Sequence, residues 1–203
     1  MTNRVGILGD YTPAKPSLVR TGVSWLDEHT GGGVPARASL LLSGPETTSR
    51  MKLAMRIARW SSASRVLWYA IGSTDAAMAA VKAVPSTEAS DFCLRSFDGI
   101  GELQEQLDRY EPDLVVVGDF RICRPIVGPA SADIHREMCL RAITTVAESD
   151  RPCVGVFAVD LGESRMPMAL GHRVDISILV SKDGIAKIEK NRFGDLYEGG
   201  LVA

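Results

Sequence analysis

Short apolar runs alternate with segments of helical periodicity along most of this chain, and this alternation restricts its fold more than any other feature. The main apolar runs lie at 39–42, 65–70, 113–117 and 153–159. Parallel strands that are buried on both faces have such continuous apolar runs. The segments between them repeat apolar side chains at helical spacing. Strands that alternate with helices predict an α/β domain with a mostly parallel, twisted sheet flanked by helices.

The C-terminal part of the chain has a different pattern. Two apolar strands, at 175–180 and 185–189, flank the pair Asp183-Gly184, which is typical of a tight hairpin. We therefore expect an antiparallel hairpin at the end of the parallel sheet. A further short strand is expected at 92–95, and helices are expected at 51–61, 74–83, 100–110 and 132–149.

The length of 203 residues suits one domain. We place this domain at 18–203, after an irregular lead-in at 1–17 that contains Gly and Pro. The net charge of -2 makes no general case for nucleic-acid binding, so only a local basic patch would support it. The N-terminus has no signal-like apolar stretch, and no window is long enough to span a membrane. These features predict a cytoplasmic protein without a membrane partner.

The cysteines give no sign of a metal site. Cys93, Cys123, Cys139 and Cys153 are far apart in the sequence, without a CxxC pair or a histidine at ligand spacing. We expect reduced thiols and no bound metal.

The apolar run at 39–42 leads into a glycine turn and then into a predicted helix. Such a junction binds phosphate, because backbone N–H groups and the positive end of the helix converge there. The working motif is Gly-x-x-x-x-Gly-Lys-Ser/Thr. The equivalent positions here, and our candidates for nucleotide binding, are Gly44, Pro45, Glu46, Thr47, Thr48, Ser49, Arg50 and Met51.

Three of the four defining positions of this motif have changed. Ser49 adds a side chain where the loop needs the freedom of glycine. Arg50 keeps a positive charge, but its guanidinium is bulkier than a lysine ammonium. Met51 has no hydroxyl group for magnesium. The nucleotide expected at this loop is ATP or ADP, with Mg²⁺ lacking its usual hydroxyl ligand.

Two separate parts of the sequence resemble bacterial RecA and RadA. Residues 21–27 (TGVSWLD), 31–35 (GGGVP) and 44–48 (GPETT) are similar to the segment that leads into the phosphate loop of these proteins. Residues 172–175 (HRVD) and 190–194 (KNRFG) are similar to a RadA signature near the end of the core. The resemblance covers roughly 19–199. It implies a RecA-like P-loop core with degenerate phosphate-loop motifs.

The resemblance also indicates where catalytic carboxylates belong. RecA-like enzymes have a glutamate at the end of the second core strand, and here no carboxylate occurs before Asp75. Their magnesium-associated aspartate ends the valine-rich strand, and here Asp119 comes one residue late, after Gly118. A shift of one residue turns a strand side chain to the opposite face, although a bent strand end would bring it back. We interpret the chain as a pseudo-ATPase or a very slow one, with Asp75 and Asp119 as the candidate catalytic residues.

Other basic residues correspond to interaction sites of the resembled proteins. Lys190 and Arg192 match residues that reach into the nucleotide site of a neighbouring subunit, so a homo-oligomer or an assembly with an active RecA-like protein is expected. Two loops match DNA-binding loops, and single-stranded DNA is the expected partner; alternatively, these are ordinary surface loops. Their candidate residues are Arg121, Arg124, Arg165 and Arg173.

Three hypotheses of function remain open at this point. The first is an accessory or structural subunit in DNA recombination, repair or replication. The second is an active DNA-dependent ATPase with a non-standard phosphate loop. The third is a protein-binding regulator that no longer binds nucleotide.

Overall fold

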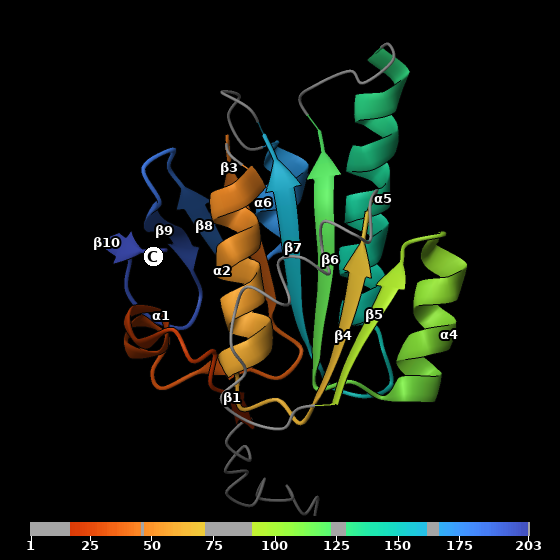
Figure 1. The fold of residues 1–203 in the computed structure, drawn as a ribbon, viewed down its shortest axis with the longest axis horizontal. Helices are drawn as coiled ribbons and strands as arrows, with labels where there is room; N and C mark the ends of the chain where they lie inside the picture. The colour runs from red at the N-terminus through yellow and green to blue at the C-terminus, as the bar shows by residue number, and fades with distance from the viewer. Residues whose placement is uncertain (1–16, 46, 72–90, 123–128, 162–166, 203) are drawn as a thin grey trace, which may run out of the picture.

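The computed structural model of the protein describes residues 17–45, 47–71, 91–122, 129–161 and 167–202. Its centre is an eight-stranded sheet with the strand order β10-β9-β8-β3-β7-β6-β4-β5 (Figure 1). The six strands from β8 to β5 run parallel, and β9 and β10 are antiparallel to their neighbours. The predicted α/β fold is therefore confirmed. The strands are β3 Ser39–Gly44, β4 Arg65–Ala70, β5 Asp91–Ser96, β6 Leu114–Arg121, β7 Val154–Asp160, β8 Ile176–Val180, β9 Ile185–Asn191 and β10 Tyr197–Leu201.

Helices cover both faces of this sheet (Figure 1). Helix α2 (Thr47–Trp60) packs on one face, where Leu40 and Leu42 of β3 meet its Leu53 and Ile57. Helices α4 (Ile100–Tyr110), α5 (Pro129–Ala147) and α6 (Met168–Arg173) pack on the other face. Because side chains alternate along a strand, neighbouring residues of β3 enter different hydrophobic layers. This double burial explains why the strands have continuous apolar sequences.

Several short elements were not predicted. Helix α1 (Ser24–His29), helix α6, the small β1–β2 pair (Leu18–Val19 with Val34–Pro35) and strand β10 have too few residues to show a periodic pattern. Helix α2 begins at Thr47 rather than at Met51, and β6 continues to Arg121. The predicted helix at 74–83 and nearly all of the lead-in lie outside the described residues. Within the described part, no helix is long and apolar enough to cross a membrane.

The first segment shared with RecA and RadA stabilises the start of the domain. The carboxylate of Asp27 accepts hydrogen bonds from the Thr21 amide (2.8 Å), the Thr21 hydroxyl (2.8 Å) and the Gly22 amide (3.1 Å). Gly22 has φ +74°, and a Cβ there would lie 2.3 Å from the carbonyl oxygen of Trp60. The turn therefore needs glycine, since a larger residue would both strain the backbone and collide with the end of α2.

Strand β10 is held by aromatic packing against α1. Tyr197 stacks on Trp25 with ring centroids 6.0 Å apart and contacts His29 at 4.2 Å. A Cβ at Gly200 would lie 2.5 Å from the Trp25 ring, so the missing side chain lets the indole approach the strand. Strand β10 pairs with β9 and thus adds a third strand to the predicted C-terminal hairpin.

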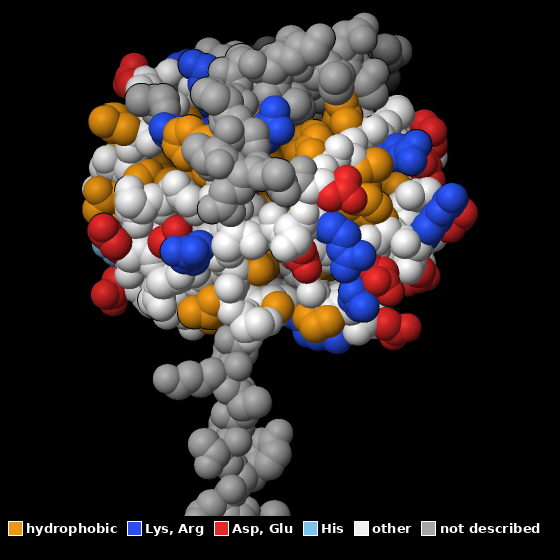
Figure 2. All heavy atoms as spheres, turned by 60° about the horizontal axis from the view of Figure 1, so that its bottom comes forward, with side chains coloured by type: hydrophobic (Ala, Val, Ile, Leu, Met, Phe, Trp, Pro, Cys, Tyr) orange, Lys and Arg blue, Asp and Glu red, His pale blue; other side chains and the backbone are white. Residues whose placement is uncertain are grey.

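The end of the molecule where the parallel strands begin has side chains of both charges. Glu111 forms ion pairs with Arg65 (3.5 Å) and Arg151 (2.9 Å). Figure 2 shows Lys and Arg side chains beside Asp and Glu side chains on this face. Among the described residues of this face, acidic neighbours offset the basic ones, which differs from the basic surface that backbone phosphates of a nucleic acid require.

We predict that Asp27→Ala lowers the free energy of unfolding by about 2–3 kcal/mol, because three donors lose a charged acceptor. Urea denaturation measures this change. The matched control is Glu28→Ala, on an exposed side chain of the same helix, which should change stability by less than about 0.5 kcal/mol. Equal effects of the two substitutions would show that the Asp27 hydrogen bonds are unimportant.

Candidate functional site

Three adjacent strands end together beside the start of α2. Gly44 is the last residue of β3 and pairs with Asp160, the last residue of β7, while β6 next to β7 carries Asp119 near its end. Ligands of open α/β sheets bind outside the carboxyl ends of the strands. This edge of the sheet is therefore where the candidate nucleotide-binding residues are found.

Arg50 of α2 connects these three strands. Its side chain is 0% exposed, and its guanidinium lies 2.7 Å from Oδ2 of Asp119 and 3.8 Å from Oδ2 of Asp160. The same guanidinium donates a hydrogen bond to the carbonyl oxygen of Gly44. Asp119 and Asp160 are themselves each only 7% exposed. Arg50 is thus part of a buried ion-pair cluster with Asp119 and Asp160.

An irregularity in β6 brings Asp119 to this cluster. Val117 pairs with Phe157 of β7, but Phe120 pairs with Val159, so β6 has one residue more than β7 over this stretch. Val117 and Phe120 both pack in the layer of α5, and Asp119 turns to the side of Arg50. The extra residue therefore compensates for the late position of Asp119 in the sequence.

Asp160 was not among the residues predicted from the sequence. It ends an apolar run and lies on the same face of β7 as Val156, because strand residues of the same parity share a face. A carboxylate at the end of a buried strand, in register with Gly44, is the signal that identifies it.

The phosphate-loop residues adopt a more compact arrangement than the motif requires. Strand β3 ends at Gly44 and α2 begins at Thr47, so Ser49 is helical and is not among the described non-glycine residues with positive φ. Glu46, and the side chains of Thr47 and Thr48, lie outside what the structure describes. Pro45 is half-buried between the two elements. In a working motif, the residues between the two glycines form a loop around the phosphates, whereas here Thr47 and Thr48 belong to helix α2.

The retained glycine of the motif, Gly44, and the altered position Met51 both have structural roles. Gly44 has φ +147°, and a Cβ there would lie 2.1 Å from the carbonyl oxygen of Val180, so glycine is required for packing as well as for a loop. The Met51 side chain packs against the core beside α2. A thioether within an apolar layer has no affinity for magnesium, which takes oxygen ligands.

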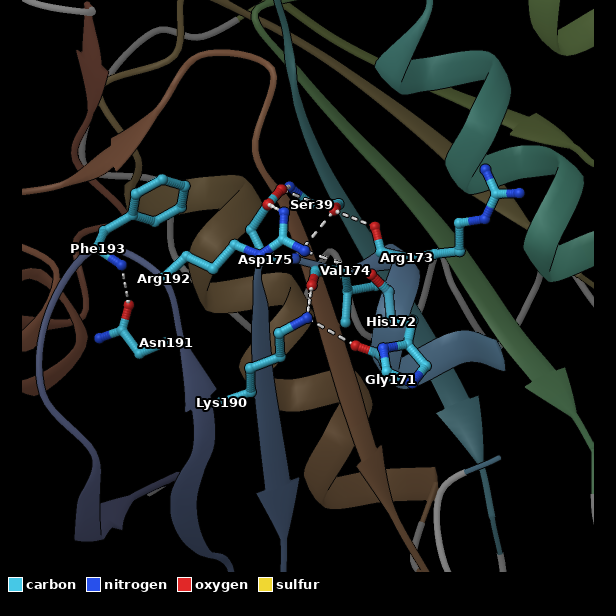
Figure 3. Close-up of polar contacts among 10 residues, drawn as sticks. All are labelled: Ser39, Gly171, His172, Arg173, Val174, Asp175, Lys190, Asn191, Arg192 and Phe193. Carbon is cyan, nitrogen blue, oxygen red and sulfur yellow. Dashed lines mark hydrogen bonds and ion pairs between the residues drawn. The ribbon is translucent and has the colours of Figure 1, made fainter. Parts of the chain in front are cut away.

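A second polar cluster joins the two segments that resemble the RadA signature (Figure 3). The Lys190 ammonium donates to the carbonyl oxygens of Gly171 (2.7 Å) and Val174 (2.5 Å). Arg192 pairs with Asp175 at 2.9 Å. The other carboxylate oxygen of Asp175 accepts hydrogen bonds from the amide and the hydroxyl of Ser39; these contacts attach the turn after α6 to β9 and to the start of β3.

The basic residues of this second cluster thus have partners within the chain. Burial lowers the pKa of Lys190, and the neighbouring charge of Arg192 adds to the effect, while Asp175 opposes it. The Arg192 side chain remains 54% exposed. A role of Lys190 and Arg192 at a neighbouring subunit stays a prediction.

The structure separates the candidate DNA-binding residues that it describes. Arg121 is exposed at the end of β6, where its amide donates to Nδ1 of His135 at 3.2 Å. Burial and the charge of Arg121 lower the pKa of His135. Arg173 lies at the other end of the sheet, because its carbonyl accepts a hydrogen bond from Ser39 at the start of β3. Arg124, Arg165 and the candidate catalytic Asp75 lie outside the described residues.

Comparison with known proteins supports the fold assignment. No protein-family model matches the chain, and no curated protein matches its sequence. Among solved structures, the chain is similar to a KaiC-like protein from the hyperthermophilic archaeon Pyrococcus horikoshii OT3, with a TM-score of 0.65 and 13% sequence identity over 90% of this chain and 93% of that one. The chain therefore has the α/β fold of this KaiC-like protein, and at this identity the similarity establishes the fold alone.

Removal of the Arg50 guanidinium should destabilise the domain strongly. We predict that Arg50→Ala lowers the free energy of unfolding by about 3–5 kcal/mol, because it leaves two buried carboxylates without their shared cation. Urea denaturation gives the value. Lys52→Ala, on the exposed side of the same helix, serves as the control and should cost less than about 0.5 kcal/mol. A loss for Arg50→Ala as small as that of the control contradicts a structural role of Arg50.

Proposed function

We propose that this protein is a RecA-like accessory or structural subunit of DNA recombination, repair or replication, and that it turns over ATP very slowly or not at all. The observation that carries this proposal is the buried ion-pair cluster of Arg50 with Asp119 and Asp160.

The ion-pair cluster contains the side chains, Arg50 and Asp119, that occupy the positions of the phosphate-binding cation and the magnesium-associated carboxylate. A phosphate-binding Arg50 has to leave two buried carboxylates, and breaking such a pair costs several kcal/mol. Asp119, the counterpart of the magnesium-associated carboxylate, accepts a hydrogen bond from the Arg50 guanidinium. Met51 supplies no oxygen ligand in place of the usual hydroxyl. The cation Arg50 and the carboxylate Asp119 are therefore bound to each other, and the hydroxyl group that would bind magnesium is replaced by Met51.

The assignment to DNA metabolism is supported by the resemblance of short segments to RecA and RadA, at 21–27, 31–35 and 44–48 and at 172–175 and 190–194. Assembly with a second copy, or with an active relative that has an intact phosphate loop, is part of the proposal. Arg192, whose side chain is about half exposed, is the residue that would face the phosphates of such a neighbour. Single-stranded DNA would bind at the edge of the sheet that carries Arg121.

Phosphate release from MgATP, measured with and without single-stranded DNA, tests the proposal. We expect no turnover above that of a preparation of Asp119→Asn, because any activity common to both preparations comes from a contaminant. DNA-stimulated turnover that Asp119→Asn abolishes contradicts the proposal and favours an active ATPase with a non-standard loop.

Nucleotide titration of the same preparations separates the remaining alternative. Binding of ATP or ADP without turnover agrees with an accessory subunit that retains a nucleotide site. Complete absence of binding at millimolar nucleotide favours a regulator that has only kept the fold.

A further inference from the structure

A groove on the face of the sheet opposite Arg50 has no role in the proposed function. It has a volume of about 470 Å³ and lies between α5 and α6, next to the start of α4. Its apolar lining consists of Ile100, Leu140 and Ala169, one from each of the three helices. This volume is in the range of sites that bind small organic molecules.

One wall of the groove is held rigidly from behind. The carbonyl oxygens of four successive residues, 171–174, accept hydrogen bonds from side chains of three residues, at or just after the end of β9 and at the start of β3. The donors are Lys190, Arg192 and Ser39. With the backbone fixed in this way, the side chains of His172 and Arg173 extend away from the Lys190 cluster, and Arg173 points toward α5 (Figure 3). The groove is thus lined by side chains on a pre-organised backbone.

Two guanidinium groups from different helices line this groove. The Arg173 side chain forms no hydrogen bond or ion pair with the residues that the structure describes. On α5, Arg141 donates a hydrogen bond through Nε to Oε1 of Glu137 at 2.8 Å, and this ion pair offsets the charge of Glu137. Thr144, a half-buried residue with a hydroxyl group, also lines the groove.

We propose that the groove between α5 and α6 binds a phosphate ester. A guanidinium group donates two parallel hydrogen bonds to phosphate, and Arg141 of α5 and Arg173 of α6 bring two such groups to the lining of this groove. The apolar residues on the floor accommodate the organic part of the ester. The phosphate belongs either to a free nucleotide-sized ester or to the backbone of a single-stranded nucleic acid. The groove is separate from the cluster of Arg50, which lies on the other side of the sheet, so neither the absence of ATP turnover nor the Arg50 cluster is needed for this inference.

Calorimetric titration with adenosine monophosphate and, separately, with a short oligothymidylate tests this inference. We expect at least one of the two to bind, and Arg173→Ala to weaken that binding by about tenfold, the loss of one charge-assisted contact. Arg141→Ala should act in the same direction. Arg136→Ala is the matched control, since this arginine is also on α5 but pairs with Asp133 at 2.8 Å and does not line the groove. It should leave the affinity unchanged.

The two ligands distinguish the source of the phosphate. Binding of the monophosphate alone identifies a free ester, and binding of the oligothymidylate, displaced by the monophosphate, identifies a nucleic acid. The inference is overturned if neither ligand binds below about 1 mM, or if Arg173→Ala and Arg136→Ala have equal effects. Binding that Arg50→Lys weakens and Arg173→Ala does not belongs to the phosphate loop. That result would also overturn the inference that the groove binds a phosphate ester, and it would leave the proposed accessory function open.

Discussion

The guanidinium of Arg50 is the group on which the arrangement of the sheet edge depends. It holds the ends of β3, β6 and β7 together through Gly44, Asp119 and Asp160, at a position where it is fully buried. In a working phosphate loop the cation at this position has to face the phosphates, which are exposed to solvent before binding. The same side chain cannot satisfy both demands, because two carboxylates left without their cation are costly in a low-dielectric interior.

The second cluster repeats this use of basic residues within the chain. Lys190 and Arg192 bind the segment at 171–175, so the two halves of the RadA-like signature are partners of each other in the fold. The residues that resemble RecA and RadA therefore stabilise the fold through contacts that need no catalysis. Asp27 has the same kind of role in the first segment, where it organises the turn at Thr21 and Gly22. These contacts explain how the fold persists with an altered phosphate loop.

The positions of the central strands along the chain followed from the sequence, because each is buried on both faces and has a continuous apolar run. The site was less predictable. The face that Asp119 occupies depends on one extra residue in β6, which appears only when β6 is paired with β7. The orientation of the Arg50 side chain involves Asp160, which is distant in the sequence and belongs to no recognisable motif. The groove beside α5 needed the position of α6, a helix too short to show periodicity.

A double-mutant cycle between Arg50 and Asp119 tests the central claim most directly. The free energy of unfolding is measured for the wild type, Arg50→Ala, Asp119→Ala and the double variant, with and without saturating MgATP. If Arg50 is bound to Asp119 whether or not nucleotide is present, the coupling energy is at least about 2 kcal/mol and is the same in both conditions. A coupling near zero, or one that disappears when MgATP is added, would show instead that Arg50 is available to the nucleotide.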